Sequence, residues 1–198
     1  MPPANPIGLD THADATLRYI RASMEAASVV TVPGSAGVTM GMVGILAAVA
    51  GSTPALRQEW LLVWLTAALL AAGAGGLIMA RQAARQGFTL FGAPLRKLLL
   101  CLAPALFGGA ILTWVHLAAG NLHAIPGTWL LLYGCALVSA SAPTARIVAV
   151  LGALFILLGL LAFAAPERFL NPLLGIGFGG LHLVFGVLIG RQASAREA

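Results

Sequence analysis

The sequence predicts an all-α polytopic membrane protein, with six transmembrane helices preceded by a cytoplasmic amphipathic helix. Six long apolar stretches follow one another between Val38 and Gly190, and nearly all Lys and Arg side chains fall on one side of the membrane that these stretches imply. Hydrophobic residues make up 60% of the chain and charged residues 9%, whereas soluble domains contain about half and about a quarter. A chain of this composition requires lipid as its solvent.

The length of the chain leaves little room outside the membrane. Its 198 residues hold six spans of about 20 residues each, so we expect one transmembrane bundle over residues 35–191. Residues 1–34 are expected to form an N-terminal tail and the amphipathic helix, and residues 192–198 a short C-terminal tail. No basic start followed by an apolar core opens the chain, so the first span is expected to be retained as an anchor.

The amphipathic helix is predicted over residues 13–30. Its apolar side chains, such as Leu17, Ile20 and Met24, recur every three or four residues, as one face of a helix requires. The helix lies either in the membrane interface or across the cytoplasmic end of the bundle. Because its polar face carries anions as well as cations, whereas lipid-binding helices are rich in Lys and Arg, we favour a structural role. Pro33 and Gly34 end the helix.

The spans are predicted in chain order from the apolar stretches. They cover residues 36–51, 60–80, 98–119, 127–141, 147–164 and 173–190. The first and fourth are short for a bilayer and need little tilt or some local thinning of it. Pro104 lies about two turns into the third span, where it is expected to kink the helix.

The distribution of cations predicts the orientation. One side holds Arg18, Arg21, Arg81, Arg85, Arg96, Lys97, Arg146, Arg191 and Arg196. The other side holds only Arg57 and Arg168. This bias places both termini in the cytoplasm by the positive-inside rule. The tryptophans support the same orientation, because Trp60, Trp114 and Trp129 lie at the outer ends of their spans and Trp64 lies one turn deeper. Indole rings suit the headgroup layer.

Small residues indicate how the helices pack. Three glycine pairs are spaced four residues apart on one helix face: Gly37 and Gly41, Gly175 and Gly179, and Gly186 and Gly190. In lipid, small residues allow backbones to approach closely, so we expect these six glycines at helix contacts. The alternative is a glycine-lined path or hinge. The first three spans do not repeat in the last three, which disfavours an inverted-repeat transporter.

Few groups in the spans can carry chemistry. No Asp, Glu, Lys or Arg lies within the core of a predicted span, so paired carboxylates for acid–base catalysis or ion-coupled transport are absent from the pattern. We therefore expect no enzymatic activity. Cys101 and Cys135 fall inside apolar spans and lack the close spacing of a metal site, so we expect buried, free thiols. The basic segment 81–97 is expected to reflect topology rather than specific lipid binding.

His182 is the candidate cofactor-binding residue. It lies near the middle of the sixth predicted span, shortly after Gly179 and Gly180, where a ligand or another helix has room to approach. It either ligates a haem or metal or relays protons, or it is a neutral histidine bonded to a neighbouring helix. His116 lies at a different depth, and with His123 it supplies too few ligands for a specific metal site.

Several segments resemble a family of uncharacterised small bacterial six-helix integral membrane proteins. The segments are residues 17–25 (LRYIRASME), 32–34 (VPG), 126–134 (PGTWLLLYG), 146–148 (RIV) and 177–182 (GFGGLH). The resemblance covers most of the chain from Leu17 onward. It implies a multi-pass helical bundle in the bacterial inner membrane, and it implies no activity, cofactor or substrate.

Three functional hypotheses follow. The first is a non-enzymatic accessory protein that acts through helix contacts, with the lipid bilayer and a membrane-protein partner or a second copy as its partners. The second is a haem- or metal-binding protein that uses His182. The third is a small-solute transporter or channel, suggested by Pro104 and the glycines. The cations form no stripe interleaved with aromatic residues, which excludes a nucleic-acid-binding protein.

Overall fold

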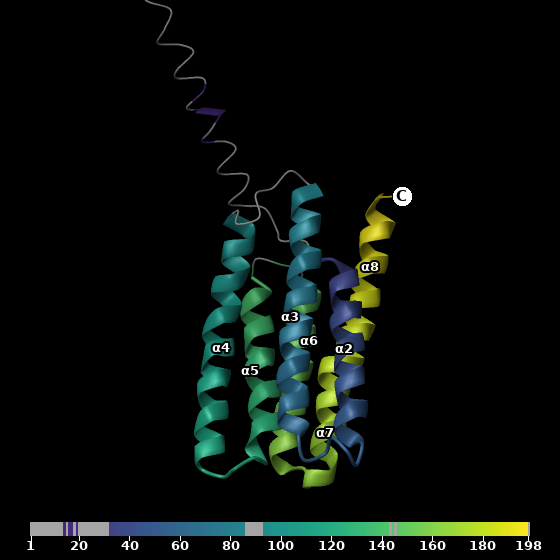
Figure 1. Cartoon of the computed structure of the whole chain (residues 1–198). Coiled ribbons are helices and arrows are strands. Elements are labelled where there is room, and N and C mark those ends of the chain that lie inside the picture. The colour runs from purple at the N-terminus through teal and green to yellow at the C-terminus, as the bar shows by residue number, and fades with distance from the viewer. Residues whose placement is uncertain are drawn as a thin grey trace, which may run out of the picture.

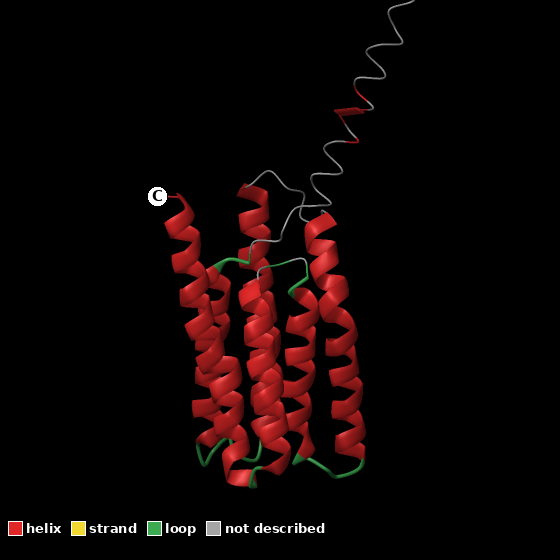
Figure 2. Cartoon of the chain, turned by 180° about the vertical axis from the view of Figure 1, so that it is seen from behind, coloured by secondary structure: helices red, strands yellow, loops and turns green. Residues whose placement is uncertain are grey.

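The computed structural model describes Asp14, Thr16, Leu17, Tyr19, residues 32–85, 93–142 and 144, and residues 146–197. The described part of the chain is helical apart from short connections, as Figure 2 shows. Five helical segments in it are long and apolar enough to cross a membrane, and a sixth, Ala124–Ala140, is apolar but shorter. The all-helical class predicted from the sequence is therefore correct.

The helices follow the apolar stretches in order. They are α2 (Gly34–Ser52), α3 (Trp60–Arg85), α4 (Ala93–Ala118), α5 (Ala124–Ala140), α6 (Arg146–Ala164), the 3₁₀ turn η1 (Glu167–Phe169), α7 (Leu170–Leu174), the π-helix η2 (Gly175–Leu181) and α8 (His182–Glu197). Elements α7, η2 and α8 follow one another without a break, so together they form one long helical segment.

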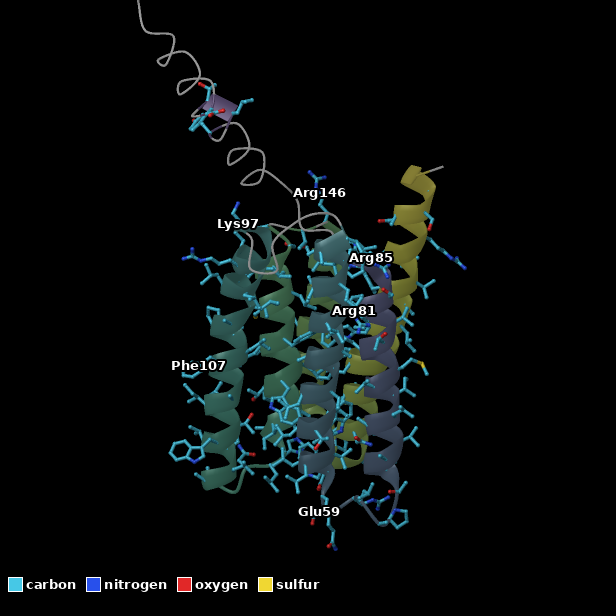
Figure 3. The ribbon with its side chains drawn as sticks, turned by 45° about the horizontal axis from the view of Figure 1, so that its top comes forward. Glu59, Arg81, Arg85, Lys97, Phe107 and Arg146 are labelled. Atoms are coloured by element: carbon cyan, nitrogen blue, oxygen red, sulfur yellow. The ribbon has the colours of Figure 1, made fainter. Side chains whose placement is uncertain are left out.

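Successive helices run up and down along one axis (Figure 1). The start of α2 and the end of α8 consequently lie at the same end of the bundle. Arg85, Lys97 and Arg146 gather at that end, whereas Glu59 lies at the opposite end (Figure 3). The bundle therefore has one strongly basic end, which we call the basic end, and a far end that carries the α2–α3 connection and α7.

Helix α2 packs against η2 and α8 along a row of glycines. Gly34, Gly37, Gly41 and Gly44 recur every three or four residues along α2, which keeps them on one face. A methyl group on Gly37 would lie 2.9 Å from the Cα atom of Gly186. The two backbones are therefore in direct contact, with no side chain between them.

A second glycine contact joins α5 to α6. A Cβ atom on Gly134 would lie 2.7 Å from the carbonyl oxygen of Gly152, and one on Gly152 would lie 2.8 Å from that of Gly134. A Cβ atom on Gly159 would lie 2.6 Å from the backbone nitrogen of Leu131. This pair is therefore as close as α2 and α8, which the sequence analysis did not anticipate.

Helices α3 and α4 lie at the periphery. Within the described residues, α3 packs mainly on α2, and α4 mainly on α5. Most of their apolar side chains face outward, among them Leu69 and Phe107 (77% and 69% exposed). The bundle thus consists of two glycine-packed helix pairs in the centre, with one further helix attached to each.

The structure corrects several details of the sequence analysis. The last helix does not end at residue 190 but continues to Glu197, through the expected C-terminal tail. Helix α4 starts at Ala93, five residues before the predicted span, and Pro104 lies inside it. Cys135 is exposed on the surface of α5 rather than buried, while Cys101 is half-buried, and both are free thiols. Both cysteines lie within apolar helices, but periodicity alone did not place Cys135 on the outward face.

Other expectations lie largely outside the described residues. Four residues of the predicted amphipathic helix over residues 13–30, namely Asp14, Thr16, Leu17 and Tyr19, are helical and exposed. The other residues between 1 and 31, and so the placement of this helix, lie outside the described part of the chain. The same is true of residues 86–92 in the basic segment.

The glycine contacts predict a large difference between two alanine substitutions. Gly186→Ala brings a methyl group within 2.5 Å of the backbone nitrogen of Val38, and overpacking of this kind costs about 1–3 kcal/mol. Gly73→Ala is the matched control, since a Cβ there meets no described atom within 4 Å, and alanine favours helix over glycine. In thermal unfolding in detergent, Gly186→Ala should lower Tm and Gly73→Ala should not. Equal stability of both variants would contradict backbone-level packing.

Candidate functional site

His182 lies where the two glycine-packed pairs meet. It is the first residue of α8 and is only 4% exposed. Its ring stacks on Phe178 of η2, with 6.3 Å between centroids and 13° between planes, and meets the edge of Phe155 of α6 at 5.3 Å. Tyr133 of α5 completes the group, which we call the aromatic cluster. The cluster joins α5 and α6 to η2 and α8.

The rings of the aromatic cluster fill the space around the imidazole. Tyr133 lies 4.9 Å from Phe155 and 5.1 Å from Phe178, and Phe155 lies 5.2 Å from Phe178, all between centroids. Tilted and edge-to-face arrangements at these distances are the favourable ones for aromatic rings. Phe155 is fully buried, so the centre of the bundle at this level is closely packed.

The π-helix η2 leads directly into His182. It spans seven residues with four glycines, GIGFGGL. Wide π turns are rare and costly, and glycine tolerates them because it adds no side chain to crowd the neighbouring helix. A Cβ atom on Gly177 would lie 2.6 Å from the side chain of Leu130 and 3.1 Å from the ring of Phe155. Gly177 therefore leaves room for the side chains of Leu130 and Phe155 against η2.

The hydroxyl oxygen of Tyr133 lies 2.8 Å from Nε2 of His182. A tyrosine hydroxyl has one hydrogen to donate, and a neutral imidazole has one nitrogen that accepts. With Tyr133 donating to Nε2, the imidazole proton lies on Nδ1. This donor assignment is ours, since the 2.8 Å contact fits either tautomer. The bond connects α5 to α8 through the middle of the bundle.

The second ring nitrogen of His182 is buried without a regular partner. Nδ1 has no hydrogen bond in the described part of the protein, although the backbone of Gly177 and Phe178 lies near the ring. The carbonyl groups of these two residues belong to the π turn, where hydrogen bonds run over five residues instead of four.

Two further polar contacts attach α4 to α5. The indole N–H of Trp129 donates to the hydroxyl of Thr113 at 2.7 Å. Nε2 of His116 lies 3.1 Å from the hydroxyl of Thr128, which donates its own hydrogen to the carbonyl of Ala124. His116 is thereby the donor to Thr128. His116 thus has a structural partner on α5, while His123 is exposed in the connection before that helix.

Asn171 attaches α3 to the far end of the bundle. Its amide nitrogen donates to the carbonyl of Ala48 and to the hydroxyl of Ser52, at 2.9 and 2.8 Å. Its amide oxygen accepts the indole N–H of Trp64 at 2.8 Å. Trp64 is 3% exposed, so its ring is buried between helices, which its position one turn inside the outer end of the span did not predict. One side chain thus joins α2, α3 and α7.

The structure brings the six predicted packing glycines to one helix contact. Gly37 and Gly41 of α2 face Gly179 and Gly186 across the interface, Gly175 faces Ala48, and Gly190 lies beside Gly34 at the basic end. Sequence reasoning missed Gly34 and Gly44 in the same contact, and Gly134, Gly152 and Gly159 in the other. The glycines of α5 and α6 are at least seven residues apart within each helix. The search for glycines spaced four residues apart therefore did not find them.

The candidate metal-binding side chains do not come together in the described part of the folded chain. Among the described residues, no group of three or more His, Cys, Asp or Glu side chains is placed to hold a metal ion. His182 has Nε2 engaged by Tyr133, so ligation through that nitrogen requires the tyrosine to move away. As it stands, the Tyr133–His182 bond can hold helices α5 and α8 together.

Comparisons with protein-family models, with curated proteins and with solved structures found no match to this chain.

The Tyr133–His182 bond predicts a measurable coupling. Tyr133→Phe leaves a buried imidazole nitrogen without its donor, at a cost of about 1–3 kcal/mol. His182→Leu leaves the tyrosine hydroxyl unpaired at similar cost. The double variant should be destabilised by less than the sum of the two, with a coupling of at least about 0.5 kcal/mol. Unfolding in detergent measures all four proteins, and additive losses would show that the bond contributes nothing.

Proposed function

We propose that this chain is a six-span protein of the bacterial cytoplasmic membrane that acts as an accessory component, through contacts with a membrane-protein partner or a second copy, and performs no catalysis. The observation that carries this proposal is the state of His182. This buried imidazole is enclosed by aromatic rings and bonded to Tyr133. It therefore serves helix packing, which is what an accessory bundle requires.

The proposed topology rests on the two ends of the bundle. Five segments have the length and composition to cross a bilayer. We count α5 as a sixth span, because 17 residues at ~1.5 Å each reach about 26 Å, close to the hydrocarbon thickness of about 30 Å. Placing the basic end in the cytoplasm follows the positive-inside rule. Both termini are then cytoplasmic.

The features that suggested transport do not support it in the folded chain. Pro104 is exposed on α4. The glycine pairs, for which a path was the alternative interpretation, lie at the contact of α2 with η2 and α8. A methyl group added to Gly73 or Gly76 of α3 would meet no described atom within 4 Å. These two glycines leave room for a neighbouring helix, which suits the accessory function.

One observation favours a second candidate, a haem- or metal-binding protein. Nδ1 of His182 is buried and has no regular partner, and such nitrogens occur at ligand sites. The π turn beside it adds a second feature common at functional sites. Binding through Nδ1 would require η2 to open away from the ring.

Absorption spectra and metal analysis separate the two candidates. The protein, purified in mild detergent, should show no Soret band and no stoichiometric metal, and the His182→Gln variant should be identical to it in both respects. Tyr133→Phe is the control that frees Nε2 without removing the imidazole. A chromophore or metal that is present in the wild type and lost in His182→Gln would overturn the accessory proposal in favour of the cofactor protein.

Cysteine labelling in intact cells tests the topology. In a background with Cys101 and Cys135 replaced by serine, a membrane-impermeant maleimide should label Gln58→Cys and Asn121→Cys, which lie in the far-end connections. Ala142→Cys, at the basic end, should react only after lysis. Labelling of Ala142→Cys in intact cells would show the opposite orientation, and protection of Asn121→Cys alone would remove α4 and α5 from the set of spans.

A further inference from the structure

We propose that a groove at the far end of the bundle binds one phospholipid with a phosphoethanolamine headgroup. The groove lies between the end of α6 and the start of α7, and its volume is about 380 Å³. Its walls include Leu161, Ala164 and Ala165 on one side and Phe169, Pro172 and Ile176 on the other. The inference rests on the membrane placement proposed above and goes beyond the accessory function.

The groove has the chemistry and depth of an acyl-chain site. Its lining is almost entirely apolar. Phe169 lies next to the α6–α7 turn, and Ile176 is seven residues further along a helical segment, or about 10 Å deeper at ~1.5 Å per residue. A groove that descends this far from the turn holds the upper part of a lipid chain, with the headgroup at the turn.

The turn carries the two charges that a phosphoethanolamine headgroup needs. Glu167 and Arg168 are adjacent and exposed. The guanidinium of Arg168 lies over the ring of Phe169, 4.9 Å from its centroid, and Phe169 itself lines the groove. Arg168 can donate to a phosphate, while Glu167 can accept from the ammonium group. A choline headgroup has no N–H to donate, and a glycerol headgroup has no cation.

The charges at the far end argue against a purely anionic lipid. The described charged side chains there are Arg57, Glu59, Glu167 and Arg168, which give two cations and two anions. An anionic lipid at Arg168 would be attracted by this cation and repelled by the adjacent anion Glu167, so its attraction would be offset. A zwitterionic lipid with a donor ammonium satisfies both side chains.

Photo-crosslinking tests the proposal on the full chain in liposomes. Phosphatidylethanolamine, phosphatidylcholine and phosphatidylglycerol, each with a diazirine on the acyl chain, are activated by light, and crosslinked peptides are quantified by mass spectrometry. We expect phosphatidylethanolamine to label the groove peptides about three- to tenfold more than either other lipid, the range that one or two exposed charged contacts provide. The surface of α4 around Phe107 should be labelled equally by all three lipids.

Matched variants separate the headgroup contacts from the groove. Glu167→Gln and Arg168→Gln should each reduce the preference for phosphatidylethanolamine at the groove, whereas Glu59→Gln and Arg57→Gln, at the same end, should not. Phe169→Ala should reduce labelling of the groove, and Phe107→Ala, an exposed phenylalanine on α4, should not. Equal labelling of the groove by all three lipids would overturn the proposal.

The outcome for the groove is distinguishable from the outcome for the membrane placement. Labelling of α4 without any preference at the groove would reject the lipid site and leave the membrane placement standing. Absence of labelling at both places would reject the membrane placement, and the lipid site with it. A preference for phosphatidylglycerol that disappears in Arg168→Gln would overturn the proposal in favour of an anionic-lipid site.

Discussion

The close approach of helix backbones at glycine is the constraint on which the rest of the structure depends. Between α2 and α8, and between α5 and α6, added Cβ atoms would fall within 3 Å of main-chain atoms of the facing helix. Helix association in lipid gains little from the hydrophobic effect, so contact area and dispersion must hold these pairs. Because the two helices of each pair lie so close together, the aromatic side chains between the pairs can meet in the centre of the bundle.

Polar side chains then fix how the other elements attach to these pairs. His182 and Tyr133 join the two pairs to each other, Asn171 joins α3 to α2 and α7, and Thr113 and Trp129 join α4 to α5. Each is a directional hydrogen bond in an apolar setting, so each specifies the position of one helix relative to its neighbour, which dispersion alone does not. The accessory function we propose follows from this use of polar groups for internal contacts.

The sequence predicted what depends on local pattern and missed what depends on distant pairing. Apolar length located the helices, and glycines four residues apart located most of the α2–α8 contact. The partners of Trp64 and His182 lie 107 and 49 residues away, and no periodicity reports such pairs. The π turn was also unpredictable, since glycine-rich sequence suits α-helical packing equally well. The burial of Trp64 was not predicted either, because an indole near a span end fits both the headgroup layer and an interhelical bond.

The most direct test is the state of the His182 imidazole in a lipid bilayer. Nitrogen-15 NMR of the histidine-labelled protein, with His182→Gln to assign the signals, reports which ring nitrogen carries a proton. We predict a neutral ring protonated on Nδ1, with an Nε2 signal that shifts when Tyr133 is replaced by phenylalanine. A metal-bound nitrogen, or an Nε2 signal unchanged by Tyr133→Phe, would contradict the conclusion that His182 joins the two helix pairs.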